Sequence, residues 1–326
     1  MRIIQTLIVT TILLTASLCA AGNNHYGSTT KPAIVIASFG TTQPEALAAI
    51  LNIRDKAQKA FPETRVALTF TSNIIRTIWQ ERAVDPAYSA AHPEIPADVL
   101  HVKGILATLG LLQDQGYNAL VVQPTHIAHA EQFIDLCSYV EGLAAIDTVK
   151  AKYRPFHALA VGRPLTGTHG IEHDYNEDIN TLARALAADV ELAVANDSEL
   201  VYMAHGNDHY STGVFNQLQE VMRRMYPQVT TYIGGVEGFP GFTEVIRELE
   251  RDSVTKVTLK PLMIVAGDHA FNDMAGDDED SWASRLSARG ITPLPVLEGL
   301  GKNDLVTSIF VEHIGDAAAD SGVTLR

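Results

Sequence analysis

Two histidines in the second half of the sequence each follow directly on a short apolar stretch. His269 comes after the β-prone stretch 257–264, and His205 comes after residues 200–204. A third residue, Glu237, lies in a glycine-rich turn after another such stretch. Two imidazoles and a carboxylate suit a divalent metal site with open coordination positions. Spacing alone leaves two interpretations open: the three side chains converge, or they are unrelated residues hydrogen-bonded in their own loops.

The same construction, an apolar strand that runs into a polar loop, occurs four times. The four segments are residues 33–42, 119–129, 200–209 and 257–269. Their loops are rich in His, Gly, Ser, Thr and Asp. In open α/β sheets, ligands bind just beyond the carboxyl ends of the strands. We therefore expect these loops to face one cleft.

The elements that must position these loops alternate between strand and helix, which predicts α/β architecture with parallel sheets covered by helices on both faces. The pattern runs twice, so we expect two similar doubly wound, Rossmann-like domains, residues 29–164 and 165–302, with a cleft between them. The Gly-, Pro- and Thr-rich segment 162–173 is the expected crossing. A last helix, 303–320, could pack back on the first domain. Other predicted helices span residues 99–115, 174–196 and 279–289.

The first 28 residues have the pattern of an export signal. Arg2 precedes an apolar stretch over residues 3–18, and small residues follow around Ala20 and Ala21. The stretch is shorter than the roughly 20 residues of a membrane-spanning helix, so a stable membrane anchor is the less favoured interpretation. Leu18 does not suit a lipoprotein site at Cys19. We expect a cleaved signal peptide and a periplasmic mature protein.

Composition excludes several classes of partner. The formal charge of −14, without a basic run, argues against nucleic acid and anionic membranes. The chain has no P-loop and no G-x-G-x-x-G motif, so no nucleotide cofactor is expected. Once the signal leaves, Cys137 is the one remaining cysteine. A metal must then be held by imidazole and carboxylate, which suits cobalt, iron, nickel or zinc.

Five stretches carry a resemblance to a known family. They are AIVIASFGTT, QPTHI, YMAHG, GGVEGFP and LKPLMIVAGDHAFNDMAGDDEDSW. Together they resemble the anaerobic sirohydrochlorin cobaltochelatases of the class II chelatase superfamily, over nearly all of the chain after residue 30. The resemblance implies a chelatase-like fold and insertion of Co2+, with Fe2+ as a second candidate metal, into sirohydrochlorin with release of two protons. It also implies that His205, Glu237 and His269 bind the metal and that the two histidines are catalytic.

The loop around residues 126–131 departs from the cytoplasmic members of that family, in which an acidic residue faces the cleft. Glu131 could supply this acid, although Gln132 could hold the aligned position. His129 looks like an addition. It is either a surface histidine or helix cap, or, with His126 as the alternative, an axial ligand of haem or another metallated tetrapyrrole.

Sirohydrochlorin is a polycarboxylate, so the family resemblance implies a cleft that is more basic than the whole chain. Five residues could supply the charge, although a solvated surface position is the favoured interpretation for each: Arg54, Arg76, Arg82, Arg163 and Lys260.

Two function classes follow. The first is a chelatase that acts on sirohydrochlorin and a divalent metal. The second is an exported protein that binds haem, tetrapyrrole or metal on a chelatase fold. Export favours the second, because tetrapyrrole synthesis is normally cytoplasmic, whereas retention of His205, Glu237 and His269 favours the first. In either case we expect a homo-oligomer.

Overall fold

Two parallel sheets of four strands form the framework of the protein. A computed structural model describes residues 30–168, 170–207 and 213–326. The first sheet has the order β2-β1-β3-β4, with β1 Pro32–Ser38, β2 Arg65–Phe70, β3 Ala119–Pro124 and β4 Ala158–Val161. The second has the order β6-β5-β7-β8, with β5 Glu199–Gly206, β6 Thr231–Glu237, β7 Lys256–Leu262 and β8 Thr292–Pro295. The two halves thus repeat one topology. The predicted signal peptide lies outside the described residues.

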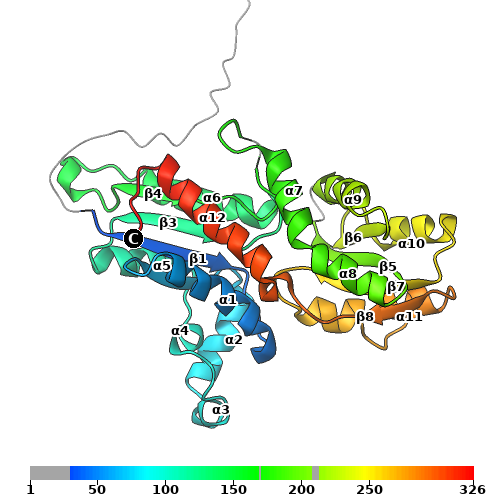
Figure 1. The fold of residues 1–326 in the computed structure, drawn as a ribbon. Coiled ribbons are helices and arrows are strands. Elements are labelled where there is room, and N and C mark those ends of the chain that lie inside the picture. Colours follow the sequence, from blue (N-terminus) through cyan, green and yellow to red (C-terminus); the bar gives the residue numbers. More distant parts are fainter. Residues whose placement is uncertain (1–29, 169, 208–212) are drawn as a thin grey trace, which may run out of the picture.

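Helices cover both faces of the first sheet because alternate strand residues point to opposite sides. Ile34 and Ile36 of β1 pack toward α1 (Pro44–Ala60) and α12 (Asp304–Asp320). Val35 packs on the opposite side with α5 (Ile105–Asp114) and α6 (Glu131–Ala144). Figure 1 shows α12 lying along this sheet.

The second sheet is covered in the same way. Leu200 and Tyr202 of β5 face α7 (Tyr175–Ala185), α8 (Ala187–Ala195) and α9 (Gly213–Met225). Val201 and Met203 face α10 (Phe242–Arg251) and α11 (Trp282–Ser287). The central strands of both sheets are therefore sandwiched between helical layers, which confirms the predicted doubly wound architecture.

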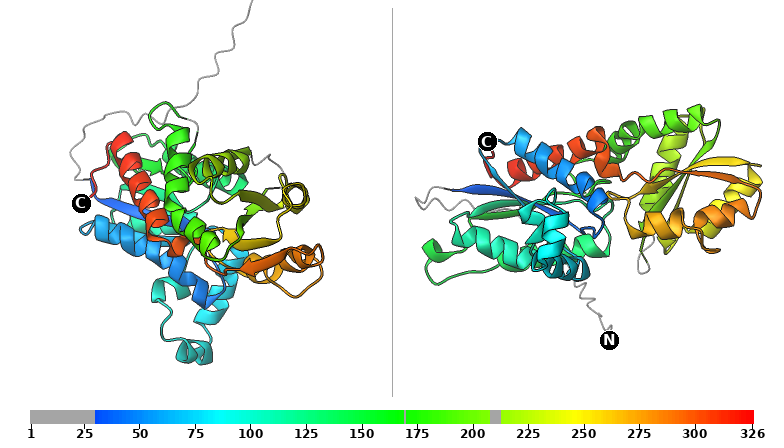
Figure 2. Two further views of the ribbon diagram at one scale, coloured as in Figure 1. Left: turned by 45° about the vertical axis from the view of Figure 1, so that its right-hand side comes forward. Right: turned by 90° about the horizontal axis from the view of Figure 1, so that it is seen from below.

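The C-terminal helix α12 follows the second sheet in the chain but packs on α1 and β3 of the first half. It also contacts α7 of the second half. One hydrophobic core runs beneath it, from Ile34 through Phe310 to Tyr202. The two lobes that lie side by side in Figure 2 are therefore joined by shared apolar packing as well as by chain crossings.

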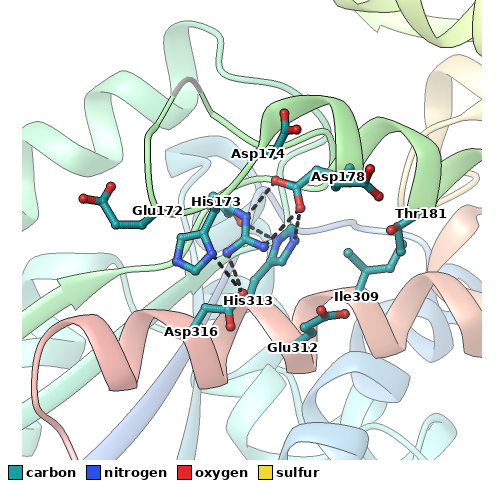
Figure 3. A pocket seen from close by; sticks show the side chains of 11 residues that line it. Glu172, His173, Asp174, Asp178, Thr181, Ile309, Glu312, His313 and Asp316 are labelled. Atoms are coloured by element: carbon teal, nitrogen blue, oxygen red, sulfur yellow. Dashed lines mark hydrogen bonds and ion pairs between the residues drawn. The ribbon is translucent and has the colours of Figure 1, made fainter.

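A group of ionic side chains, here called the junction cluster, joins the crossing segment to α7 and α12 (Figure 3). Arg163 pairs with Asp178 of α7 and with Asp316 of α12, each at 2.7 Å. The buried His313 lies 3.4 Å from Asp178, and its Nδ1 lies 3.1 Å from the carbonyl oxygen of Arg163. His173 of the crossing segment lies 2.8 Å from Asp320 and 3.6 Å from Asp316, both in α12. The cluster holds the crossing segment against both halves.

The segment after β2 forms three short helices: α2 (Asn73–Ala83), α3 (Pro86–Ala91) and α4 (Ala97–Leu100). Ser72 caps α2 by accepting a hydrogen bond from the backbone nitrogen of Ile75, as its position suggests. Figure 1 shows α3 projecting away from the first sheet. The remaining helical turns are η1 Ala151–Tyr153, η2 Ala270–Met274 and η3 Leu300–Lys302.

Three predicted helices were wrong in extent, because tertiary contacts compete with local periodicity. The helix over 99–115 is divided into α4 and α5, since the carbonyl oxygen of Lys103 accepts hydrogen bonds from Thr69 and Phe70. The helix over 174–196 is interrupted at Leu186. The third begins at Trp282 rather than 279, after an acidic run that does not open it. Within the described part of the chain, no helix is both long and apolar enough to cross a bilayer.

Candidate functional site

A cleft of about 590 Å³ lies where the carboxyl ends of strands from both sheets meet. Its walls come from the loops after β1, β3, β5, β6 and β7 and from one face of α2. The lining residues include Ser38–Thr42, Thr125–Ala128, Ala130–Phe133, His205–Asn207, Glu237, Leu262–Val265 and Gly267–His269. All four strand–loop segments singled out in the sequence contribute to it. The cleft is the natural ligand site of this architecture.

His205, Glu237 and His269 come together on one wall of this cleft. The two imidazole rings meet edge to face, with centroids 4.9 Å apart at an interplanar angle of 86°. Nδ1 of His205 lies 3.8 Å from Oε2 of Glu237. The side chains remain 43 %, 43 % and 41 % exposed in that order, so an ion from solvent can reach them. Of the two interpretations, the structure therefore supports convergence.

Glycine brings the ends of β5 and β6 together. Gly206 has a φ of +82°, and a Cβ there would lie 1.9 Å from the carbonyl oxygen of Glu237. Gly238 has a φ of +72°, and a Cβ there would lie 2.0 Å from the carbonyl oxygen of Asn207. Because neither residue has a side chain, the two loops pack backbone against backbone. This close approach places His205 beside Glu237.

His269 lies at the start of the π-helical turn η2, which follows the end of β7. Its Nδ1 is 2.5 Å from Oδ2 of Asp273, one turn further on. On the other imidazole, Nδ1 of His205 lies 3.2 Å from the carbonyl oxygen of Gly206. Both rings are thus held on their Nδ1 side. Sequence reasoning missed Asp273, although its i+4 spacing from His269 is a signal that could have found it.

His205, Glu237 and His269 do not enclose a position for a metal ion on all sides. Among the described residues, no group of three or more His, Cys, Asp or Glu side chains has the geometry to hold a metal ion. Structural metal sites surround the ion with ligands, whereas sites that exchange ligands keep positions open. A paired imidazole with a neighbouring carboxylate suits a metal that is bound and then handed on.

The opposite wall carries the loop that follows β3. Both ring nitrogens of His126 are buried and have no hydrogen-bond partner within the described residues. This burial lowers the pKa of His126 to about 4, so its imidazole is neutral at neutral pH. His129 is exposed, its ring packs edge-on against Phe133, and partial burial lowers its pKa. The structure therefore leaves His129 the more accessible of the two histidines.

Glu131 and Gln132 both line the cleft at the start of α6. The choice between them as the residue equivalent to the family's cleft acid thus stays open in this structure. Glu131 is the acidic one, and it lies in the first turn of the helix, where the positive end of the dipole favours a carboxylate.

The expected basic side chains do not line the cleft. Lys260 forms a buried ion pair with Asp189, which also accepts a hydrogen bond from Tyr202. Arg163 belongs to the junction cluster, and Arg54 pairs with Asp98 on the surface. Each of these three charges is paired with a carboxylate outside the cleft lining. The prediction that they serve the cleft was wrong, because each is paired with a carboxylate elsewhere in the fold.

Arg76 and Arg82 donate hydrogen bonds to main-chain carbonyl groups near the cleft. Arg76 donates to the carbonyl oxygens of Phe70 and Thr71. Arg82 donates to the carbonyl oxygen of Thr42, and its guanidinium lies 4.6 Å from the ring centroid of Trp79. Both lie just behind the lining. Across the described residues, the cleft surface itself contains no lysine or arginine.

Apolar side chains make up much of the remaining lining. Ile74, Ile75 and Ile78 come from α2, and Met263 and Val265 come from the segment after β7. The spacing of the three isoleucines puts them on one face of the helix. The cleft thus combines a polar wall of histidines and carboxylates with apolar surfaces that suit a flat organic ring.

A smaller cavity of about 250 Å³ lies at the junction cluster, between α7 and α12. Glu172, Asp174, Glu177 and Glu312 add to its acidic lining. Its central charges are already paired with one another, and it is remote from the strand ends. We assign this cavity a structural role.

Two doubly wound halves with paired histidines in the cleft between them define a chelatase-like α/β protein. The fold is similar to that of the sirohydrochlorin chelatase SirB from Bacillus subtilis subspecies spizizenii, solved in complex with cobalt, with a TM-score of 0.53 and 12 % identity over 91 % of this chain and 99 % of that one. The sequence pattern of the cobalt chelatase (CbiK) family matches residues 32–319. The chain belongs to that family.

Two relatives extend the similarity over most of the sequence. The sirohydrochlorin cobaltochelatase of Salmonella typhimurium is 30 % identical over 290 residues, which cover 88 % of this chain and 96 % of that protein. The sirohydrochlorin cobaltochelatase CbiKC of Nitratidesulfovibrio vulgaris is 29 % identical over 89 % of this chain and 92 % of that protein.

Proposed function

We propose that this protein is a metal chelatase that inserts Co2+ into sirohydrochlorin. The observation that carries the proposal is the pairing of His205 and His269 at the carboxyl ends of strands in an apolar-walled cleft. Family membership supplies the substrate class, since both relatives described above are named for this reaction.

The reaction exchanges two pyrrole N–H protons for one Co2+. His205 and His269 bind the incoming ion through imidazole nitrogen, with Glu237 beside them. As the ion passes to the ring nitrogens, the vacated imidazole nitrogens accept the two protons that leave the pyrroles. Release to solvent is direct, because both side chains are more than two-fifths exposed. No nucleotide and no covalent intermediate are needed.

The macrocycle enters with its plane against the apolar walls formed by α2 and the loop after β7. Its peripheral carboxylates then point toward the mouth of the cleft and solvent. The absence of lysine and arginine from the described cleft surface supports this orientation. A carboxylate buried without a cationic partner would be costly, so an inward orientation is disfavoured.

Absorbance tests this function directly. The purified protein is mixed with sirohydrochlorin and Co2+, and the spectral change of the macrocycle is followed against a protein-free control. Acceleration above the uncatalysed rate is expected. Parallel runs with Fe2+ define metal preference. No acceleration with either ion would contradict the proposal.

We also propose that residues 1–28 are a cleaved export signal and that the mature protein is periplasmic. The support is the pattern of Arg2, the apolar stretch and the small residues near Ala21. Mass spectrometry of the protein from its native host should find a new N-terminus between residues 20 and 30. An intact Met1, or a lipid on Cys19, would contradict it.

A second ligand is proposed for the exported protein: haem or a similar metallated tetrapyrrole, bound through His129. The exposure of His129, between the cleft-lining residues Ala128 and Ala130, supports it, whereas the ring nitrogens of His126 are buried. Such a site could lie between subunits of a homo-oligomer. Visible spectra and gel filtration with added haem, for the wild type and His129→Ala, test this. Identical spectra with and without His129 would contradict it.

A pure binding role without chelation is the less favoured alternative.

A further inference from the structure

We propose that Asp273 is a positioning residue that holds His269 in the tautomer with hydrogen on Nδ1. The Nε2 atom then carries the lone pair that binds the incoming metal. This inference rests on the proposed function, because it assigns a role within the same site.

The hydrogen bond itself determines the tautomer. Oδ2 of Asp273 lies 2.5 Å from Nδ1 of His269. An ionised carboxylate can only accept, so Nδ1 must be the donor. A neutral imidazole carries a single N–H, which leaves Nε2 as the acceptor. The π-helical turn η2 presents Asp273 on the same side as His269, four residues earlier.

His205 reaches the same state by a different route. Its Nδ1 lies 3.2 Å from the carbonyl oxygen of Gly206, which also can only accept. Glu237 lies at 3.8 Å from this nitrogen, beyond hydrogen-bond distance. Both imidazoles therefore present Nε2 for ligation. The backbone orients His205, whereas a side chain orients His269, so only the second can be removed by substitution.

Asp273 acts better as a partner of His269 than as a ligand of its own. Its near oxygen is occupied on the Nδ1 side, away from the nitrogen left for the metal. Carboxylates behind a ligating histidine fix its orientation and raise its basicity, and their loss typically costs 10–100-fold in metal affinity or activity.

The experiment compares full-length wild type with Asp273→Ala and Asp273→Asn, and with Asp277→Asn as matched control. Asp277 is exposed in the same acidic segment, so its variant removes one nearby charge without touching His269. Two readouts apply: 15N NMR of the histidine side chains in metal-free protein, and calorimetric titration with Co2+. Circular dichroism checks the fold. The Asp273 carboxylate is 46 % exposed, so little loss of stability is expected.

In the wild type we expect His269 as the Nδ1–H tautomer. Asp273→Ala should shift it toward the Nε2–H form and weaken Co2+ binding by roughly 10–100-fold. Asp273→Asn retains an oxygen acceptor, so it should keep the tautomer and lose less affinity. The control should match the wild type in both readouts. In the chelatase assay, kcat should fall while KM for sirohydrochlorin stays unchanged.

Three results would overturn the inference. An unchanged tautomer and affinity in Asp273→Ala would remove the role. A loss of affinity with an unchanged tautomer would make Asp273 a ligand or a source of charge. A wild-type His269 already in the Nε2–H form would directly exclude the proposed positioning role of Asp273. Failure of the proposed function is distinguishable, because it would appear as a wild type that inserts no cobalt, whatever the variants show.

Discussion

The backbone of Gly206 lies against that of Glu237 so closely that the site depends on the absence of a side chain. A Cβ on Gly206 would stand 1.9 Å from the carbonyl oxygen of Glu237, and φ is +82°. We predict that Gly206→Ala lowers the free energy of unfolding by about 2–4 kcal/mol and separates His205 from Glu237. Denaturant titration and the insertion rate measure both effects.

Gly315→Ala is the matched control for that substitution. Gly315 lies within α12, and a Cβ there meets nothing within 4 Å. Alanine is the better helix former, so this variant should gain roughly 0.5–1 kcal/mol without change in activity. A Gly206→Ala protein as stable and active as the wild type would show that the loops do not need their close contact.

Removal of either imidazole should stop metal insertion without unfolding the protein. His205→Ala and His269→Ala change half-exposed side chains outside the three hydrophobic cores. We expect a stability change within about 1 kcal/mol and loss of detectable cobalt insertion. The control is His101→Ala, an exposed histidine away from the cleft. Near wild-type rates in both cleft variants would make the metal assignment wrong, and unfolding of either would indicate a structural role.

His126 should make stability depend on pH above 4. Burial lowers its pKa to about 4 from an ordinary value of 6.5, so the unfolded chain binds the extra proton first as pH falls. The contribution is fully present above pH 6.5 and is lost as pH falls toward 4. We expect a decrease of roughly 2–3 kcal/mol across this window.

His126→Phe tests this directly, because phenylalanine keeps an aromatic ring but has no ring nitrogen to protonate. The two buried nitrogens of His126 lack protein partners among the described residues, so their removal should not destabilise the protein at pH 7. Urea titrations at several pH values should show a flatter profile between 4 and 6.5. A variant with the same slope as the wild type would place the titration elsewhere.

The junction cluster should matter at lower pH. Burial alone would raise the pKa of Asp178, but hydrogen bonds from His313 and Arg163 outweigh it and hold this pKa at about 2. The lowered value stabilises the fold above pH 4, and the effect disappears as pH falls toward 2. About 2 kcal/mol should be lost across that window.

Asp178→Asn should remove that dependence and also cost about 3–5 kcal/mol at neutral pH, because Arg163 is left buried with Asp316 as its remaining partner. Asp147→Asn is the control, since Asp147 pairs with Arg154 on the surface. Thermal unfolding of both variants gives the comparison. Equal, small effects would mean that the junction cluster adds no stability.

The local spacing of apolar and polar residues was sufficient to predict the two-sheet architecture of this protein. Apolar runs such as residues 33–37 and 200–204 have the length of buried strands, and each ends in small polar residues that cannot continue a strand. Strand, helix and turn depend on side-chain spacing over a few residues, so the two sheets and their helical layers were predictable. The same pattern placed His205, Glu237 and His269 at strand ends, but spacing alone left their convergence open, and their assignment as metal ligands came from the family resemblance.

Tertiary structure alone decided how charge and orientation are distributed in the cleft. Lys260 was expected there, but it pairs with Asp189, 71 residues away. The burial of the His126 nitrogens, the contact of Gly206 with Glu237 and the interruption before α5 are likewise set by distant segments. Such contacts depend on which surfaces meet after the sheets form. Local spacing has no information about them, because the energy of a buried charge or a close backbone approach belongs to both partners together.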